Sequence, residues 1–174
     1  MHTQIHTSKK LEKTIQPLIQ KGSVPSENFF GKWNATIFYV NRKKCWLVTN
    51  AKTQYNVLMT DIKAADLKNI ETIFKNAFFS QLVYDGIIVP FETLDQHIGT
   101  LCFLSTDNDR KTTGFQNYRL ADMEYWKAYY GSLENMPISD LNNRMNNIYI
   151  HLTKSRSWKD SALPKDLMRE LVLG

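Results

Sequence analysis

The sequence of 174 residues is poor in the residues that define several specialised protein classes. Seven glycines and five prolines are too few for a collagen-like or linker-rich chain. The two cysteines, Cys45 and Cys102, cannot form the disulfide framework of a small secreted domain. No apolar run approaches the roughly 20 residues that cross a bilayer, so we expect no membrane partner. The polar N-terminus has no apolar signal core, and we therefore expect a cytoplasmic protein with reduced thiols.

The motifs of the common enzyme and metal-binding classes are also missing. There is no Walker loop, no G-x-G-x-x-G, no H-E-x-x-H and no G-x-S-x-G. Asp107–Asp109 resembles the opening of a calcium loop, but Lys111 and Thr112 stand where a ligand and a glycine belong, which favours a plain turn. The spacing of zinc ligands is absent among the four histidines, His2, His6, His97 and His151. We expect neither a cofactor nor a metal.

Hydrophobic periodicity predicts a single α+β domain. Apolar residues alternate with period two across two short polar turns, which predicts an antiparallel β-meander over about residues 33–60. We expect a fourth strand near 101–105 and a short strand or extended entry at 4–6. Both faces of the meander carry apolar residues, so both should be covered. The alternative is two subdomains divided near residue 90.

Four or five helices should pack on this sheet. Apolar residues three and four positions apart predict them over 8–20, from 61 or 63 to 84, around 120–130, after Pro137 and after Pro164. Residues 87–91 should be extended, and 105–111 should form a turn.

Three segments carry a family resemblance: His6–Leu11, Trp33–Ala35 and Lys44–Thr53, with a weaker one at Thr113–Asn117. They resemble an uncharacterised bacterial family that is known only as a domain of unknown function. The similarity covers about the first two thirds of the chain. It implies one compact domain and no activity, because none is attached to the family.

Positive charge is concentrated in the first third of the chain. Residues 1–60 hold nine Lys and Arg against two Glu, and the net charge of the whole chain is +5. A basic face attracts polyphosphate or an acidic protein surface, although a solvated Lys-rich surface has the same composition. We expect a non-enzymatic module that binds nucleic acid through Lys9, Lys10, Lys13, Arg42, Lys43, Lys44 and Lys52. Trp46 and Tyr55 could stack on bases, but aromatic residues in a meander more often belong to the core.

A protein–protein or self-association module is the second reading. The segment 115–130 holds more aromatic residues than one helical face buries. Trp126, Tyr129 and Tyr130 follow the expected core stripe, which leaves Tyr118 and Tyr125 pointing outward as an interaction patch. A homo-oligomer would use the same patch.

A small metal-independent ribonuclease is the third reading. Residues that position phosphate and stabilise its developing charge occur within eight positions, at Tyr149, His151, Lys154 and Arg156. His6 with Lys9 and Lys10 supplies a second set of these residue types, and neither spacing is diagnostic. Separately from this reading, Asp85, Glu92, Asp95 and His97 fall in a predicted loop, where a carboxylate that orients an imidazole suits acid–base chemistry. The sequence assigns no catalytic residue.

Overall fold

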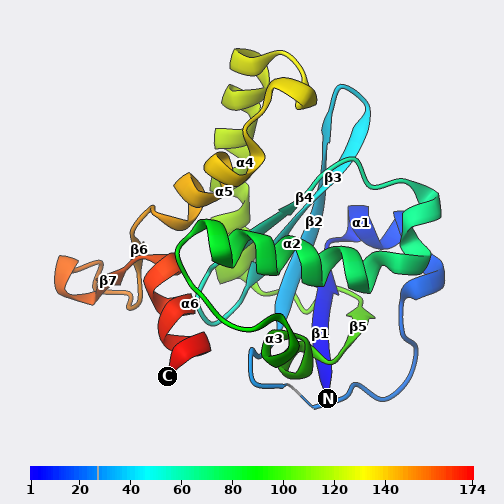
Figure 1. Ribbon diagram of the computed structural model, residues 1–174, viewed down its shortest axis with the longest axis horizontal. Helices are drawn as coiled ribbons and strands as arrows, with labels where there is room; N and C mark the ends of the chain where they lie inside the picture. Colours follow the sequence, from blue (N-terminus) through cyan, green and yellow to red (C-terminus); the bar gives the residue numbers. More distant parts are fainter. Residues whose placement is uncertain (27) are drawn as a thin grey trace.

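A five-stranded mixed sheet organises the protein in the computed structural model, which describes residues 1–26 and 28–174. The strand order is β4-β3-β2-β1-β5. The interior strand β1 runs parallel to both of its neighbours, β2 and β5, and β2, β3 and β4 form the predicted antiparallel meander (Figure 1). The strand bounds are β1 (His2–Thr7), β2 (Trp33–Val40), β3 (Lys43–Asn50), β4 (Asn56–Met59) and β5 (Thr100–Leu104). The α+β class, the meander and the fourth strand are confirmed.

Helices cover both faces of the sheet. They are α1 (Lys9–Thr14), α2 (Ile70–Tyr84), α3 (Phe91–Ile98), α4 (Arg110–Tyr130), α5 (Ile138–Asn146) and α6 (Pro164–Leu173). Short 3₁₀ turns span Gln16–Leu18, Ala64–Asn69, Leu133–Asn135 and Trp158–Asp160. A small second sheet pairs β6 (Ile150–His151) with β7 (Ser161–Ala162). Among the described residues, no helix combines the length and hydrophobicity of a membrane span.

The face under α2 is an aromatic core. Trp33 at the start of β2 meets Phe74 and Phe78 edge-to-face, with ring centroids 5.4 and 5.1 Å apart. All three side chains are almost fully buried. Because buried aromatic rings combine a large area with specific geometry, they supply much of the packing energy on this side.

The face under α4 and α5 is divided into an apolar and a polar half. Phe38, Leu47 and Leu58 pack against α4 and α5 toward the tip of the β2–β3 hairpin. Farther down, a row of polar residues crosses the strands, and Gln116 of α4 donates to the carbonyl of Asn34 at 2.8 Å. The first part of α4 therefore contacts the sheet through hydrogen bonds, and the later part contacts it through apolar side chains.

The helix after β1 is shorter than the sequence predicts. It ends at Thr14, and a 3₁₀ turn at Gln16–Leu18 replaces the rest of the expected helix. The cause is Pro17, which lacks the N–H that an α-helix needs and clashes with the carbonyl four residues earlier.

The segment 91–98 is helical, so the loop expected there is wrong. Leu94 and Ile98 of α3 are four residues apart and both face the core. The residues just before it, 87–90, pair with no strand, since Pro90 cannot donate to a ladder.

The helix expected around 120–130 begins earlier, at Arg110. Asp109 caps it, because its carboxylate accepts hydrogen bonds from the N–H and the hydroxyl of Thr112. Tyr129 is 71% exposed, so its assignment to the core stripe is wrong. Tyr118 and Tyr125 point outward as predicted, with exposures of 71% and 67%.

Candidate nucleic-acid interface

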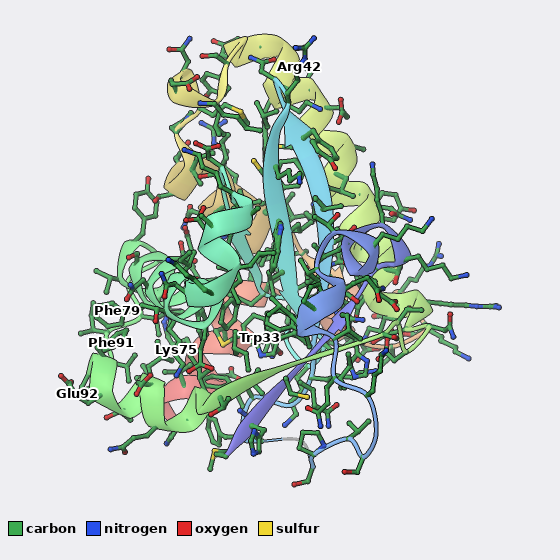
Figure 2. The ribbon with its side chains drawn as sticks, turned by 90° about the vertical axis from the view of Figure 1, so that its right-hand side faces the viewer. Trp33, Arg42, Lys75, Phe79, Phe91 and Glu92 are labelled. Atoms are coloured by element: carbon green, nitrogen blue, oxygen red, sulfur yellow. The ribbon has the colours of Figure 1, made fainter. Side chains whose placement is uncertain are left out.

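Part of the predicted basic face gathers beside the β2–β3 hairpin. Lys9, Lys10 and Lys13 are exposed on α1, which packs against β2. The Lys10 ammonium lies 5.2 Å from the ring centroid of Tyr39 on β2, a cation–π contact. Figure 2 shows Arg42 at the tip of the hairpin. Cations of α1 and of the tip thus lie along the same hairpin.

The remaining predicted cations, Lys43, Lys44 and Lys52, are paired, half-buried or distant from this group. Lys43 forms an ion pair with Glu134, and Lys44 is half-buried. Lys52 follows the far end of β3, and its ammonium donates to the carbonyl of Phe29 at 3.1 Å. Since a strand rises about 3.3 Å per residue, Lys52 lies roughly 25 Å from the hairpin tip. The seven cations do not form one surface.

The aromatic platforms considered for this face are buried. Trp46 is 1% exposed and Tyr55 is fully buried, so both belong to the core. The Tyr55 hydroxyl donates to the carboxylate of Asp85 at 2.5 Å. Burial and that carboxylate raise the pKa of Tyr55, which keeps the phenol protonated.

A second basic surface combines cations with exposed aromatic rings. The outer side of α4 and the turn between β6 and β7 enclose a groove with a volume of about 660 Å³. We call it the α4–β6 groove, and its lining residues are Lys111, Gly114, Phe115, Tyr118, His151, Leu152, Thr153, Lys154 and Arg156. Among the residues that the structure describes, this lining holds no carboxylate. Within the described parts of the chain, no ion pair involves Lys111, Lys154 or Arg156.

Hydrogen bonds shape the turn between β6 and β7, which carries four of the lining residues. The Asp160 carboxylate accepts from the hydroxyls of Thr153 and Ser155 at 3.0 and 2.8 Å. These bonds hold the pKa of Asp160 below its usual value. Arg156 has φ of 52°, so the chain reverses sharply there. The short side-chain bonds of this turn set the direction in which Lys154 and Arg156 leave the backbone.

Gly114 gives the groove part of its width. It is a glycine inside α4, where glycine is about 1 kcal/mol less favourable than alanine. A Cβ placed on Gly114 would meet no heavy atom within 4 Å. Packing therefore does not demand a glycine here, and the missing side chain leaves space in the groove.

An aromatic stripe extends the groove along α4. Tyr118, Tyr125 and Tyr129 are spaced by seven and four residues, which places them on one helical face. Sequence reasoning found Tyr118 and Tyr125 on α4, and it found His151, Lys154 and Arg156 in the turn. It missed Lys111 and Phe115, and only the fold shows that these segments face one another.

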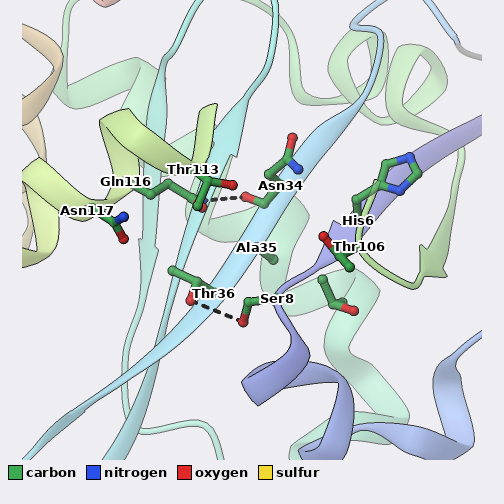
Figure 3. A pocket seen from close by; sticks show the side chains of 10 residues that line it. His6, Ser8, Asn34, Ala35, Thr36, Thr106, Thr113, Gln116 and Asn117 are labelled. Atoms are coloured by element: carbon green, nitrogen blue, oxygen red, sulfur yellow. Dashed lines mark hydrogen bonds between the residues drawn. The ribbon is translucent and has the colours of Figure 1, made fainter. Parts of the chain in front are cut away.

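A small polar pocket lies on the other side of α4, between that helix and the ends of β1 and β2. Its volume is about 50 Å³, and His6, Ser8, Thr36 and Gln116 are among its lining residues (Figure 3). The Thr36 hydroxyl donates to the Ser8 hydroxyl at 3.2 Å. A pocket of this size accepts water or a small polar group rather than a nucleotide.

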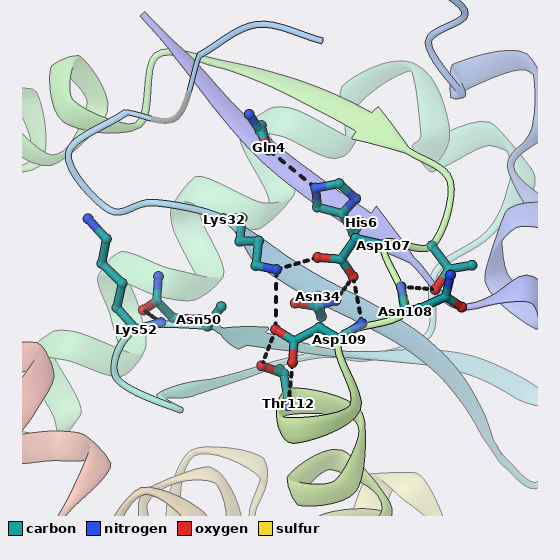
Figure 4. Close-up of polar contacts among 12 residues, drawn as sticks. Gln4, His6, Lys32, Asn34, Asn50, Lys52, Asp107, Asn108, Asp109 and Thr112 are labelled. Carbon is teal, nitrogen blue, oxygen red and sulfur yellow. Dashed lines mark hydrogen bonds and ion pairs between the residues drawn. The ribbon is translucent and has the colours of Figure 1, made fainter. Parts of the chain in front are cut away.

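The segment that resembled a calcium loop is an ion-paired turn. The Lys32 ammonium lies 2.5 Å from Asp107 and 3.3 Å from Asp109 (Figure 4). Burial alone would raise the pKa of Asp107, but hydrogen bonds from Lys32 and from the N–H of Asp109 outweigh it and lower that pKa. The pKa of Asp109 is lowered likewise, since hydrogen bonds from Thr112 and the charge of Lys32 outweigh burial.

The acidic residues suggested for acid–base chemistry are used structurally and lie apart. The Asp85 carboxylate is buried and accepts from Tyr55, Gln81 and Asn143. Asp95 pairs with Lys75 at 2.8 Å. Glu92 is exposed on α3, and His97 packs its ring against Phe29. No cluster of three or more His, Cys, Asp or Glu suited to a metal occurs among the described residues.

Comparison with known proteins places the chain in a family without assigning a role. Residues 4–165 match the model of a domain of unknown function, DUF6933. No curated protein and no solved structure matches the chain. The match spans most of the sequence, so the chain belongs to the DUF6933 family.

Proposed function

We propose that this DUF6933 protein is a non-enzymatic module that binds single-stranded nucleic acid in the α4–β6 groove. The supporting observation is the meeting of Lys111, Lys154 and Arg156 with Phe115 and Tyr118 in one groove that lacks a carboxylate. Cations neutralise phosphates, while aromatic faces stack on unpaired bases of any sequence. The tyrosine stripe offers further stacking positions along α4.

A charge-reversal experiment separates this groove from the basic face beside the hairpin. One variant combines Lys111→Glu, Lys154→Glu and Arg156→Glu. The matched control combines Lys9→Glu, Lys13→Glu and Arg42→Glu, which changes the net charge equally on exposed residues. Anisotropy of a labelled oligouridylate should show a loss of more than about tenfold for the first variant and a much smaller loss for the control.

Salt dependence tests whether phosphates are contacted. Three phosphate contacts give a slope of about −2 in log K against log salt for a single strand. The groove variant should flatten this slope. The absence of oligonucleotide binding at about 50 mM salt would refute the proposal. Equal or greater loss in the control would move the site to α1 and the hairpin.

Two substitutions on α4 test the groove without changing charge. Tyr118→Ala should weaken binding by about 1–3 kcal/mol if a base stacks on the ring. Gly114→Ala should stabilise α4 by about 0.5–1 kcal/mol and weaken binding, because the new methyl group narrows the groove. Unchanged affinity in both variants, with tight binding in the wild type, would place the ligand elsewhere.

Ribonuclease activity is the second candidate, because His151, Lys154 and Arg156 line the same groove. An imidazole moves protons, and the cations would stabilise the charge that develops on phosphate. Tyr149, the fourth residue of that set, instead packs its ring 5.8 Å from Trp158. Cleavage of RNA in the presence of a chelator, with loss of cleavage in His151→Ala, would replace binding alone with catalysis.

Association with a protein is the third candidate, and the exposed tyrosine stripe favours it. Tyrosine is enriched in protein interfaces. If the stripe is a self-association surface, sedimentation should show a dimer that Tyr125→Ala combined with Tyr129→Ala dissociates.

A further inference from the structure

The outer edges of β4 and β5 and one stretch of β2 have no neighbouring strand, and other groups close the first two. On β4, the N–H of Leu58 donates to the side chain of Asn142 at 2.6 Å. The N–H of Asn56 donates to Asn146 at 2.7 Å, and its carbonyl accepts from Asn142 at 2.7 Å. The asparagines of α5 thus close this edge.

The outer edge of β5 is closed in another way. The N–H of Leu101 donates to the carboxylate of Glu71 at 3.0 Å. The carbonyl of Phe103 accepts from the N–H of Gln20 at 2.8 Å. Closing exposed edges is the usual protection of a sheet against pairing with other chains.

The third stretch lies on β2, beyond the end of β1. The parallel pairing of β1 with β2 stops at Thr7 opposite Ala35, and β2 continues to Val40. The two-residue turn after Val40 and the β3 register direct the backbone groups of Phe38 and Val40 toward β3. The N–H and C=O groups of Ile37 and Tyr39 therefore face the other way. No backbone hydrogen bond outside the ladders involves these two residues in the described chain.

A groove runs along this open edge. Its volume is about 360 Å³, and α1 and α4 form its walls. Leu120, Ala121 and Phe38 supply an apolar wall on the α4 side. The strand lies recessed between two helices, so one extended chain fits beside it better than the edge of a second sheet.

The α1 side of this groove is positively charged. Lys10 of α1 lines the groove and lies over the ring of Tyr39. Glu124 is the one carboxylate in the lining, and it is paired with Lys127 at 2.7 Å. Side chains of an added strand alternate between the two walls, because successive residues of a strand point to opposite faces.

We propose that the edge of β2 at Ile37 and Tyr39 binds an extended peptide in which acidic and apolar residues alternate. The peptide adds a strand to the sheet, as in other cases of strand addition. Its backbone pairs with Ile37 and Tyr39, its apolar side chains contact the α4 wall, and its carboxylates face Lys10. This site is separate from the α4–β6 groove.

Amide exchange measured by NMR tests strand addition directly. The probe is a short peptide of alternating valine and aspartate. Binding should slow exchange at the amides of Ile37 and Tyr39 by at least about tenfold, whereas Phe38 and Val40 are already bonded to β3. A peptide with N-methyl groups on alternate backbone nitrogens should not bind, and one with lysine in place of aspartate should bind much more weakly.

A charge variant tests the acidic specificity. Lys10→Glu should weaken binding of the acidic peptide about tenfold or more, while the control Lys159→Glu, which makes the same charge change in the β6–β7 turn, should leave binding unchanged. Failure of the acidic peptide to bind, or binding that leaves the two amides unprotected, overturns the proposal. Protection that appears in the free protein with rising concentration, or with an oligonucleotide instead of the peptide, assigns the edge to a second copy or to nucleic acid and also overturns it.

Discussion

The edge of β4 and the open edge of β2 belong to the same meander, but their outward backbone groups have different partners. Asn142 and Asn146 hold the backbone of β4 with side-chain amides. Beyond Ala35, the outward groups of β2 face a groove instead of a partner. Two buried asparagines thus occupy the backbone groups at one edge of the sheet, whereas another edge is left open. The first edge serves the structure, and the second is accessible for binding.

The largest effect should follow from opening the closed edge. Asn142→Leu keeps the side-chain size but leaves the N–H of Leu58 without its partner, while the carbonyl of Asn56 still accepts from Asn146 at 3.1 Å. An unsatisfied buried group costs about 1–3 kcal/mol, so unfolding in urea should show a loss of that size. Asn147→Leu on the same segment is the control, since that side chain donates only to the carbonyl of Asn143. Equal losses in both variants would contradict the closure of β4 by Asn142.

An intermediate effect should come from the ion pairs that Lys32 forms with Asp107 and Asp109 just before α4. Unlike the closure of β4 by asparagine side chains, these pairs depend on charge and therefore on pH. Asp107 and Asp109 have lowered pKa values, so their pairing with Lys32 stabilises the fold above about pH 4. This stability is lost as the pH falls through the lowered pKa values, because the carboxyls then take up protons that the unfolded chain already holds. Lys32→Met should lower Tm at neutral pH, and the difference from wild type should shrink as the pH falls below about 4. A difference that stays constant with pH would show that the pairing adds no stability.

The smallest effect should come from proline on the open edge. Tyr39→Pro removes an N–H that faces the groove, so the loss of stability should stay below about 1 kcal/mol, as edge strands tolerate proline. Phe38→Pro removes an N–H directed at β3 and should destabilise the meander severely. Thermal melts followed by circular dichroism compare the two variants. Comparable losses would mean that the β2 edge at Tyr39 is already paired.

Periodicity predicted the elements that one stretch of sequence specifies by itself. The meander follows from alternation, and the starts of α5 and α6 follow from Pro137 and Pro164. The break at Pro17 was readable from the sequence but was missed. The segment 91–98 has Phe91, Leu94 and Ile98 at helical spacing, but three apolar residues in eight positions are too few to distinguish a helix from a loop.

The candidate sites depend on contacts between distant segments, and for this reason the sequence predicts them only in part. Asn142 and Asn146, four residues apart, look like the polar face of an ordinary helix until β4 is placed beside them. Lys111 and Lys154 are 43 positions apart, and only the packing of the β6–β7 turn beside α4 brings them to one groove. Conversely, the charge of the first third predicted cations on α1 but not that Lys43 would be paired with Glu134.

The position of β1 between β2 and β5 sets the order in which the protein can fold. The Thr3 hydroxyl donates to the carbonyl of Ile98, 95 residues later, and β1 lies between β2 and β5. During synthesis the meander of β2, β3 and β4 emerges with all its partners, because its pairings are local. The first strand made must wait until β5 has been added before both of its sides are paired. Contacts so distant in sequence are slow to form, so closure of β1 against β5 should be the late step of folding.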